Sequence, residues 1–208
     1  MMIILGIIIS YLIGAIPTAY IYGRIYKKID IREHGSGNVG ATNVFRVLGK
    51  GPGIAVLIID ILKGVLAVAV VADLLGLTDI LSRVVLALCV VSGHNWTVFL
   101  NFKGGKGIAT SLGVLIGLTI RIASIRPVLL FTVLVWISSF LISGIISISS
   151  ILAAIALPII MVLTNQPFVL VCLGVIFCIF VVLRHRPNIK RLLTGQEPRI
   201  HLPFHKQK

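Results

Sequence analysis

Charged side chains are scarce in this sequence. Asp, Glu, Lys and Arg make up 12% of its 208 residues, against roughly 25% in soluble globular domains. Hydrophobic residues account for 58%, and the mean hydropathy is +1.10. The chain holds several runs of the length that crosses a bilayer as a helix, about 20 apolar residues. This composition excludes an ordinary soluble domain and favours a membrane protein.

Cysteine is also rare, and the acidic residues form no cluster. Cys89, Cys172 and Cys178 lie scattered within apolar runs, so they predict neither a disulfide framework nor a metal site. We interpret them as small buried hydrophobic residues. Because a magnesium site is built from grouped oxygen ligands, we expect no metal and no cofactor.

We predict an all-α, polytopic membrane protein with about seven transmembrane helices in one domain, residues 1–208. The candidate spans cover residues 2–22, 53–72, 84–100, 108–125, 127–142, 149–164 and 168–183. No basic residue precedes the first run, and it is long for a signal core, so we interpret it as a retained span. The uncharged run 127–164 is too long for one span and is expected to turn near Ser143–Gly144.

The distribution of positive charge predicts the orientation. With seven spans, the loop 23–52, the loop 101–107 and the tail 184–208 fall on one side, and they hold 15 of the 19 Lys and Arg residues. The positive-inside rule places this side in the cytoplasm and the N-terminus outside. Such a basic face sets topology and attracts anionic membrane lipids. No nucleic-acid partner is expected, because these charges are tied to a membrane surface.

Three polar motifs interrupt the apolar pattern, each between a cytoplasmic segment and a span. They are GSGNVGATNVFRVLG (35–49), GHNWTVFLNFKGGKGIATS (93–111) and RHRPNIKRLLTGQE (184–197). Glycines let backbone N–H groups approach an anion, and a following helix N-terminus adds positive potential. KGGKG leads directly into the helical pattern IATSLGVLIG. The motifs therefore indicate phosphate binding, although flexible interfacial turns would explain each loop without any ligand.

The candidate site residues come from all three motifs. We expect the anion cradle to involve the small and polar residues of the first two: Gly35, Gly37, Asn38, Gly40, Thr42, Asn43, Lys103, Gly104, Gly105 and Gly107. Arg46 offers a planar fork for phosphate oxygens. Ser36 and Lys106 are candidates for direct contact with substrate, and His185 with Asn188 would contribute from the tail.

Asp60 and Lys63 lie within the second span, where charges are costly and usually paired. Their i, i+3 spacing puts them on one helix face. Two interpretations stay open. They form a structural pair, or Lys63 points at the anion site while Asp60 holds a motif residue in place.

The three motifs, in this order, resemble the PlsY-type glycerol-3-phosphate acyltransferases, the acyl-phosphate-dependent family of bacterial membranes; DILKG at 60–64 is also similar. Thr97 and Asn101 depart from the family pattern, in positions to which we assign no catalysis. The resemblance implies transfer of a fatty acyl group from acyl phosphate to the 1-hydroxyl of glycerol 3-phosphate, giving 1-acyl-glycerol 3-phosphate and phosphate. It also implies a multi-pass protein of the bacterial cytoplasmic (inner) membrane with its active site on the cytoplasmic side.

On this interpretation Ser36, Arg46, Lys106, His185 and Asn188 are the catalytic residues. Histidine has an unperturbed pKa near 6.5, which suits a general base, so His185 is one candidate. The substrate phosphate, with a second pKa of about 6, could instead take the hydroxyl proton. We favour the substrate-assisted route and a monomer. The alternatives are a transporter of an anionic phosphorylated solute, whose sites also use glycine-broken helices, and a lipid-binding scaffold without chemistry.

Overall fold

The computed structural model describes residues 1–200, and every regular element among them is a helix. The chain forms two compact units, Met1–Ala123 and a second that begins at Ser124. Five helical segments are long and apolar enough to cross a membrane, and a sixth is added if the bent pair α10–α11 is one span. The all-α, polytopic prediction is therefore confirmed, while the count of seven spans and the single domain stay predictions. Lys206 and Lys208 of the basic tail lie outside the described residues.

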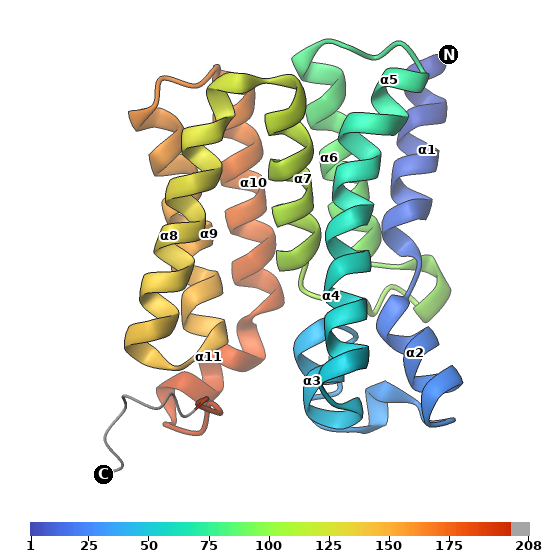
Figure 1. Ribbon diagram of the computed structural model, residues 1–208, viewed down its shortest axis with the longest axis vertical. Helices are drawn as coiled ribbons and strands as arrows, with labels where there is room; N and C mark the ends of the chain where they lie inside the picture. Colours follow the sequence, from blue (N-terminus) through green and yellow to red (C-terminus); the bar gives the residue numbers. More distant parts are fainter. Residues whose placement is uncertain (201–208) are drawn as a thin grey trace. The chain divides into compact units, whose positions relative to one another are not determined.

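The first unit contains four long helical segments and several short ones. Its elements are α1 (Met2–Ala15), α2 (Thr18–Tyr26), η1 (Ile31–Glu33), α3 (Ala41–Leu48), α4 (Lys50–Val65), the π-helical η2 (Leu66–Val71), α5 (Ala72–Leu74), α6 (Ile80–Asn95), η3 (Val98–Leu100) and α7 (Ile108–Arg121). In Figure 1, α2, α3, the end of α6 and the start of α7 all lie at one end of this unit. The first two polar motifs are thus brought to the same end.

The predicted span 2–22 is a broken helix that runs from Met2 to Tyr26. Pro17 lacks the N–H that would continue the ladder, and the residue before a proline is pushed out of the helical region. Ile16 accordingly adopts φ −52° and ψ 114°, and α2 restarts at Thr18. Thr97 Oγ1 donates to the freed carbonyl of Ala15 at 2.5 Å, and Lys63 Nζ donates to that of Ile16 at 2.6 Å. The break is stabilised because both carbonyls have donors, as a membrane interior requires.

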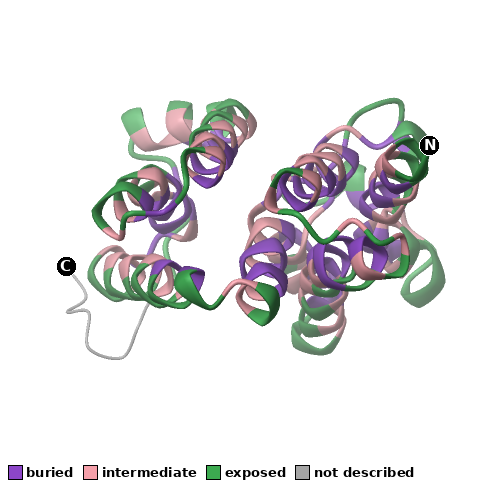
Figure 2. Ribbon diagram, turned by 90° about the horizontal axis from the view of Figure 1, so that it is seen from above, coloured by how far each residue is buried: buried purple, intermediate pink, exposed green. Residues whose placement is uncertain are grey.

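Glycines set the close approach of the long helices of this unit. A Cβ on Gly14 would overlap the backbone of Val90, and one on Gly93 would overlap that of Tyr11. In the α4–α7 pair, a Cβ on Gly64 would overlap the α7 backbone, and one on Gly113 would overlap the α4 backbone. Small residues permit such contact between membrane helices, where packing replaces the hydrophobic effect as the driving force. Figure 2 shows the buried residues of each unit on the faces that its helices turn to one another.

The π-helical turn η2 lies in the second half of the span Lys50–Leu74, where buried Arg83 contacts the backbone. Arg83, which is buried, donates from its NH1 atom to Val68 O at 2.5 Å and from its NH2 atom to Asp73 Oδ1 at 2.6 Å. Arg121, at the end of α7, also pairs with Asp73. A π-helical turn departs from the regular helix ladder, and the Arg83 guanidinium donates to one of its carbonyls, that of Val68.

The second unit contains α8 (Arg126–Ser143), α9 (Ile146–Leu163), α10 (Phe168–Arg184) and α11 (Arg186–Leu193), preceded by η4 (Ala123–Ile125). Gly144 ends α8 at a φ of 66°, a conformation that favours glycine. The turn predicted near Ser143–Gly144 is therefore confirmed. Trp136 Nε1 donates to Ser150 Oγ at 3.3 Å and ties α8 to α9.

The predicted spans 53–72, 84–100, 127–142 and 149–164 correspond to the segments Lys50–Leu74, Ile80–Leu100, Ala123–Ser143 and Ile146–Leu163. The fourth predicted span, 108–125, is only a 14-residue helix, α7, or about 21 Å at 1.5 Å per residue. The seventh, 168–183, is α10, which bends by 60° into α11. Proline at position 187, in the first turn of α11, permits this new start.

The glycine contacts make a stability prediction. Gly93→Ala should destabilise the protein by about 1–3 kcal/mol, because the added methyl overlaps the α1 backbone and overpacking has that typical cost. Gly51→Ala is the matched control. Gly51 lies in the first turn of α4 with open space around its Cα, so this change should be neutral or slightly stabilising. Thermal unfolding in detergent measures both. Equal midpoints for the two variants would contradict the packing argument.

Candidate active site

Asn43 builds the first motif loop from inside. Its side chain is 1% exposed. Its Nδ2 donates to Ile31 O at 3.2 Å and to His34 O at 3.0 Å, and its Oδ1 accepts from the Ser36 amide at 2.8 Å. These bonds fold the loop against α3. The Asn43 side chain thus holds the loop backbone, whereas the sequence analysis assigned this residue to substrate binding.

The side chains left on the outer surface of this motif are Ser36 and Arg46, both exposed, with Asn38 and Thr42 partly buried. Arg46 sits in the last turn of α3, and the same helix directs Val44 and Leu48 inward. Gly35 and Gly37 have φ values of 61° and 69°. These glycines provide the left-handed turns that return the loop to α3.

The second motif loop packs onto the end of α6. The Gly104 amide donates to Asn95 O at 3.2 Å, and the Gly105 amide donates to His94 O at 2.9 Å. A Cβ on Gly104 would overlap His94 O, and one on Gly105 would overlap His94 Nε2. The two glycines are therefore required for close packing, and these two amides point at protein carbonyls. Gly107, with φ 79°, is the N-cap residue of α7, and this helix follows KGGKG directly, as the sequence predicted.

Both loops share one small hydrophobic core. Val39 of the first motif and Leu100 of the second are buried in the same cluster, together with Val44, Leu48 and Val56. Lys103 is exposed and Lys106 is half-buried. The structure therefore brings the first two motifs together at one end of the first unit, with Ser36, Arg46 and the two lysines among their accessible side chains.

Polar atoms without partners lie next to this loop. Within residues 1–200, Nδ2 and Oδ1 of Asn95 and the hydroxyls of Thr110 and Ser111 have no hydrogen-bond partner. Asn95 is fully buried, and its amide lies against Gly107. Unpaired buried polar groups are rare in native proteins. Sequence reasoning gave Asn95 no role, although the GHNW stretch that contains it was among the three motifs.

Lys63 is 3% exposed and pairs with Asp60 at 2.7 Å. The same ammonium donates to Ile16 O at the break between α1 and α2. Of the two interpretations of this pair, the geometry favours the structural one for Lys63. Asp60 Oδ1 also lies 3.8 Å from His94 Nδ1, so Asp60 contacts a motif residue.

The third motif belongs to the second unit. His185 is 2% exposed, and its Nδ1 lies 2.8 Å from Val181 O. A carbonyl only accepts, so Nδ1 carries a proton and Nε2 is the basic nitrogen of the neutral ring. Asn188 Nδ2 donates to Glu197 Oε1 at 2.6 Å. The sequence had offered no signal for this partner of Asn188.

Glu197 organises the surroundings of Asn188. Burial acts to raise the pKa of this carboxyl, but hydrogen bonds from Asn188, Ser147 and Arg191 outweigh it and lower the pKa. The carboxylate is thus ionised at neutral pH and fixes the orientation of the Asn188 amide. Within residues 1–200, no three His, Cys, Asp or Glu residues group as metal ligands.

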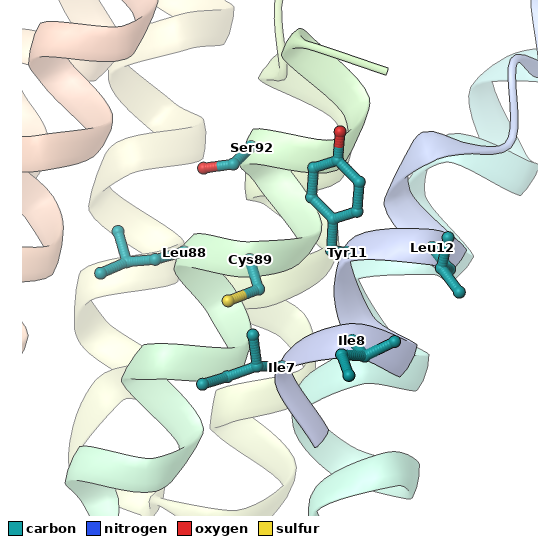
Figure 3. Close-up of a pocket in the computed structure, with 7 residues that line it drawn as sticks. All are labelled: Ile7, Ile8, Tyr11, Leu12, Leu88, Cys89 and Ser92. Carbon is teal, nitrogen blue, oxygen red and sulfur yellow. The ribbon is translucent and has the colours of Figure 1, made fainter. Parts of the chain in front are cut away.

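A groove on the first unit runs between α1 and α6 and has a volume of about 370 Å³. Figure 3 shows Ile7, Tyr11, Leu88 and Cys89 along it, with Ser92 nearest the end of α6. Tyr11 Oη donates to Trp96 O at 2.8 Å. This apolar groove therefore leads along α6 toward the second motif.

Comparison with known proteins decides among the functional alternatives. A sequence model of the family described as glycerol-3-phosphate acyltransferase matches residues 4–195. The chain belongs to the glycerol-3-phosphate acyltransferase family. The matched region contains the first two motifs and all but the last two residues of the third, so the family resemblance is confirmed. This membership makes the chain an acyltransferase of phospholipid synthesis, and it speaks against the transporter and scaffold alternatives.

Individual relatives of this acyltransferase agree. It is 44% identical to a glycerol-3-phosphate acyltransferase of Gloeobacter violaceus over 93% of both chains. It is 46% identical to one of Desulforamulus reducens over 96% of this chain and 94% of the relative. The crystal structure of PlsY, an integral membrane glycerol 3-phosphate acyltransferase, in its glycerol 3-phosphate form matches with a TM-score of 0.86, 37% identity and 96% coverage of each chain. The lysophosphatidic acid form of PlsY matches with a TM-score of 0.82.

Asp30 anchors the loop before the first motif and makes a pH prediction. Hydrogen bonds from Arg32 are the main reason that its pKa falls to about 2, from an ordinary 3.8. Asp30 therefore stabilises the fold fully above about pH 4, and this contribution disappears as the pH falls toward 2. Asp30→Asn should lower the free energy of unfolding at pH 6, and its difference from the wild type should shrink to a small fraction near pH 2. Denaturation in an acid-stable detergent measures this. A difference at pH 2 as large as that at pH 6 would contradict the assignment.

Proposed function

We propose that this acyltransferase transfers a fatty acyl group from acyl phosphate to the 1-hydroxyl of glycerol 3-phosphate. The products are 1-acyl-glycerol 3-phosphate and inorganic phosphate. The family match over residues 4–195 carries the proposal. The PlsY structures similar to this chain are in a glycerol 3-phosphate form and a lysophosphatidic acid form, and these ligands are a substrate and the product of the proposed reaction.

Arg46 and Lys106 are the proposed phosphate-binding residues of the first unit. Support comes from the shared core of the two loops and from the exposure of Arg46. Arginine binds phosphate oxygens as a bidentate fork, and lysine adds a point charge. Ser36 is the proposed hydrogen-bonding partner of the glycerol or phosphate. Asn43 and the glycines Gly104 and Gly105 act indirectly, since they shape the loops that carry these side chains.

The chemical step needs no cofactor. The 1-hydroxyl oxygen of glycerol 3-phosphate attacks the acyl carbon, the bond between that carbon and the phosphate oxygen breaks, and inorganic phosphate leaves. Negative charge develops on the acyl oxygen, where fixed donors such as Lys106 lower the barrier. The hydroxyl proton passes to the substrate's own phosphate. The competing route uses Nε2 of His185 as the base, and Asn188 serves the reaction as a hydrogen-bonding side chain.

The groove between α1 and α6 suits the acyl chain. Its lining is apolar apart from the hydroxyls of Tyr11 and Ser92 and the thiol of Cys89, and Ile8 and Leu12 at its edge are exposed. An acyl chain placed there would remain in contact with the bilayer. A lipid substrate that enters from the membrane and a soluble one that enters from the cytoplasm call for a site at the inner interface.

The remaining parts of the proposal concern placement. We propose seven spans with the N-terminus outside and the three motifs facing the cytoplasm of a bacterium, in a protein that works as a monomer. The excess of Lys and Arg in the segments that carry the motifs supports this orientation.

The donor is tested by assay of the purified protein. Acyl phosphate should give product with glycerol 3-phosphate, acyl-CoA should give little or none, and EDTA should leave the rate unchanged. The physical reason is that phosphate is already a good leaving group, and the described residues supply no cluster of metal ligands. Comparable rates with acyl-CoA, or full loss on chelation that magnesium restores, would overturn these two parts of the proposal.

Arg46 should matter more than His185. Arg46→Ala should lower kcat/KM about a hundredfold or more, since charge-assisted hydrogen bonds contribute about 1.5–3 kcal/mol each. Arg46→Lys should restore part of the loss. Lys50→Ala is the matched control, because Lys50 is an exposed cation four residues away with no proposed role, and it should stay within about twofold of wild type.

His185→Asn or His185→Gln should retain substantial activity at saturating glycerol 3-phosphate across pH 5.5 to 8.5, because an amide can hold a position but cannot accept the proton. If His185 were the general base, these variants would instead lose about 10²–10⁴-fold in rate. Collapse of both amide variants to background, with substrate binding unchanged, would make His185 the base.

A further inference from the structure

Asp60 is the centre of a buried polar network in the first unit. Its Oδ1 accepts from Lys63 Nζ at 2.7 Å and from Thr18 Oγ1 at 3.1 Å. The same oxygen lies 3.8 Å from His94 Nδ1. Asp60, Lys63, Thr18 and His94 are all at least nine-tenths buried. Three elements, α2, α4 and α6, thus meet at one carboxylate oxygen.

Helix stabilisation alone does not account for this network. Lys63 satisfies the Ile16 carbonyl, and its pair with Asp60 balances the buried charge. His94 adds no charge balance when its ring is neutral. A neutral imidazole has two different nitrogens, and a carboxylate beside Nδ1 favours the ring orientation and tautomer in which that nitrogen carries the proton.

The opposite edge of the His94 ring faces the second motif loop. A Cβ on Gly105 would overlap His94 Nε2, so the Gly105 backbone lies directly on this edge. The backbone of His94 holds the same residue, through the bond from the Gly105 amide to His94 O at 2.9 Å. The His94 ring therefore lies between the Asp60 carboxylate and the loop. The orientation of this ring determines how closely the Gly105 backbone can approach α6.

Gly105 is adjacent to Lys106, and Gly107 then starts α7. A ring that turns or shifts would move the backbone that carries Lys106. We propose that Asp60 is a positioning residue for acyl transfer, and that it acts through His94 on the Lys103–Gly107 loop. This inference rests on the proposed role of Lys106 in phosphate binding. A displacement of about 1 Å at a reacting group can cost as much as a hundredfold in rate.

A double-mutant cycle between Asp60 and Lys106 tests this coupling. Asp60→Asn alone should lower kcat/KM by roughly 10- to 100-fold. Lys106→Gln should lower it as well. In the Lys106→Gln background, Asp60→Asn should have little further effect, because the group that it positions is already absent. Residues that act independently would give additive losses.

Asp73→Asn is the matched control. Asp73 pairs with buried Arg83 and lies on the same α4–α5 segment, about 20 Å from Asp60 at 1.5 Å per residue. Its replacement should lower the unfolding midpoint, with the same small effect on rate in both backgrounds. Additive losses for Asp60→Asn, or equal coupling for Asp73→Asn, would overturn the inference and leave the phosphate role of Lys106 intact.

Two further outcomes have defined meanings. Full activity of Lys106→Gln would overturn the phosphate role of Lys106 and the inference with it. If Asp60→Asn yields no folded protein in detergent, His94→Gln takes its place in the cycle. It replaces the rigid ring between Asp60 and the loop by a flexible amide chain and leaves the Asp60–Lys63 pair intact. Coupling of His94→Gln to Lys106→Gln supports the proposal, and additivity refutes it.

Discussion

A backbone carbonyl at a break inside a membrane span needs hydrogen-bond donors, and much of the first unit depends on how these reach Ile16. Pro17 breaks the first span, and the Ile16 carbonyl accepts from Lys63 Nζ and from the Thr18 amide. A lysine in an apolar span requires a counter-ion, which is Asp60. The carboxylate in turn contacts Thr18 after the break and His94 at the end of α6. One broken helix thus explains why charges lie between otherwise apolar helices, and it connects the break to the second motif.

The glycines of the motifs act in a way that composition alone does not reveal. A glycine-rich loop before a helix is typical of an anion cradle made from backbone amides. Here the amides of Gly104 and Gly105 donate to the carbonyls at the end of α6, and the missing Cβ atoms allow that contact. Gly104 and Gly105 therefore fix the second loop on the end of α6, and in our proposal the side chains of Arg46 and Lys106 provide the charge for phosphate. Rigid support of this kind reduces the cost of organising a site during catalysis.

Local patterns predicted most of the fold, since hydrophobic run length and turn chemistry are read directly from sequence. The turn at Gly144 and the start of α7 after Gly107 followed from glycine. The broken span at Pro17 and the π-helical turn at 66–71 were missed, because long-range donors, Lys63 and Arg83, stabilise them.

In the candidate site, the residue types of the three motifs indicated phosphate chemistry. The structure then showed which of these residues support the loops from inside: the buried side chain of Asn43 accepts a hydrogen bond from the loop backbone. Glu197 was not anticipated, because its bond to Asn188 depends on the fold of the tail.

The central claim is that the first two motif loops hold the phosphate of glycerol 3-phosphate through Arg46 and Lys106. A crystal structure of this protein with glycerol 3-phosphate, grown from a lipid phase, tests it most directly. The account predicts that the Arg46 guanidinium and the Lys106 ammonium both lie within hydrogen-bond distance of the phosphate oxygens, with Asn43 still bonded to the loop. A phosphate bound elsewhere, for example on the exposed basic residues of α11, with Arg46 in solvent, would contradict it.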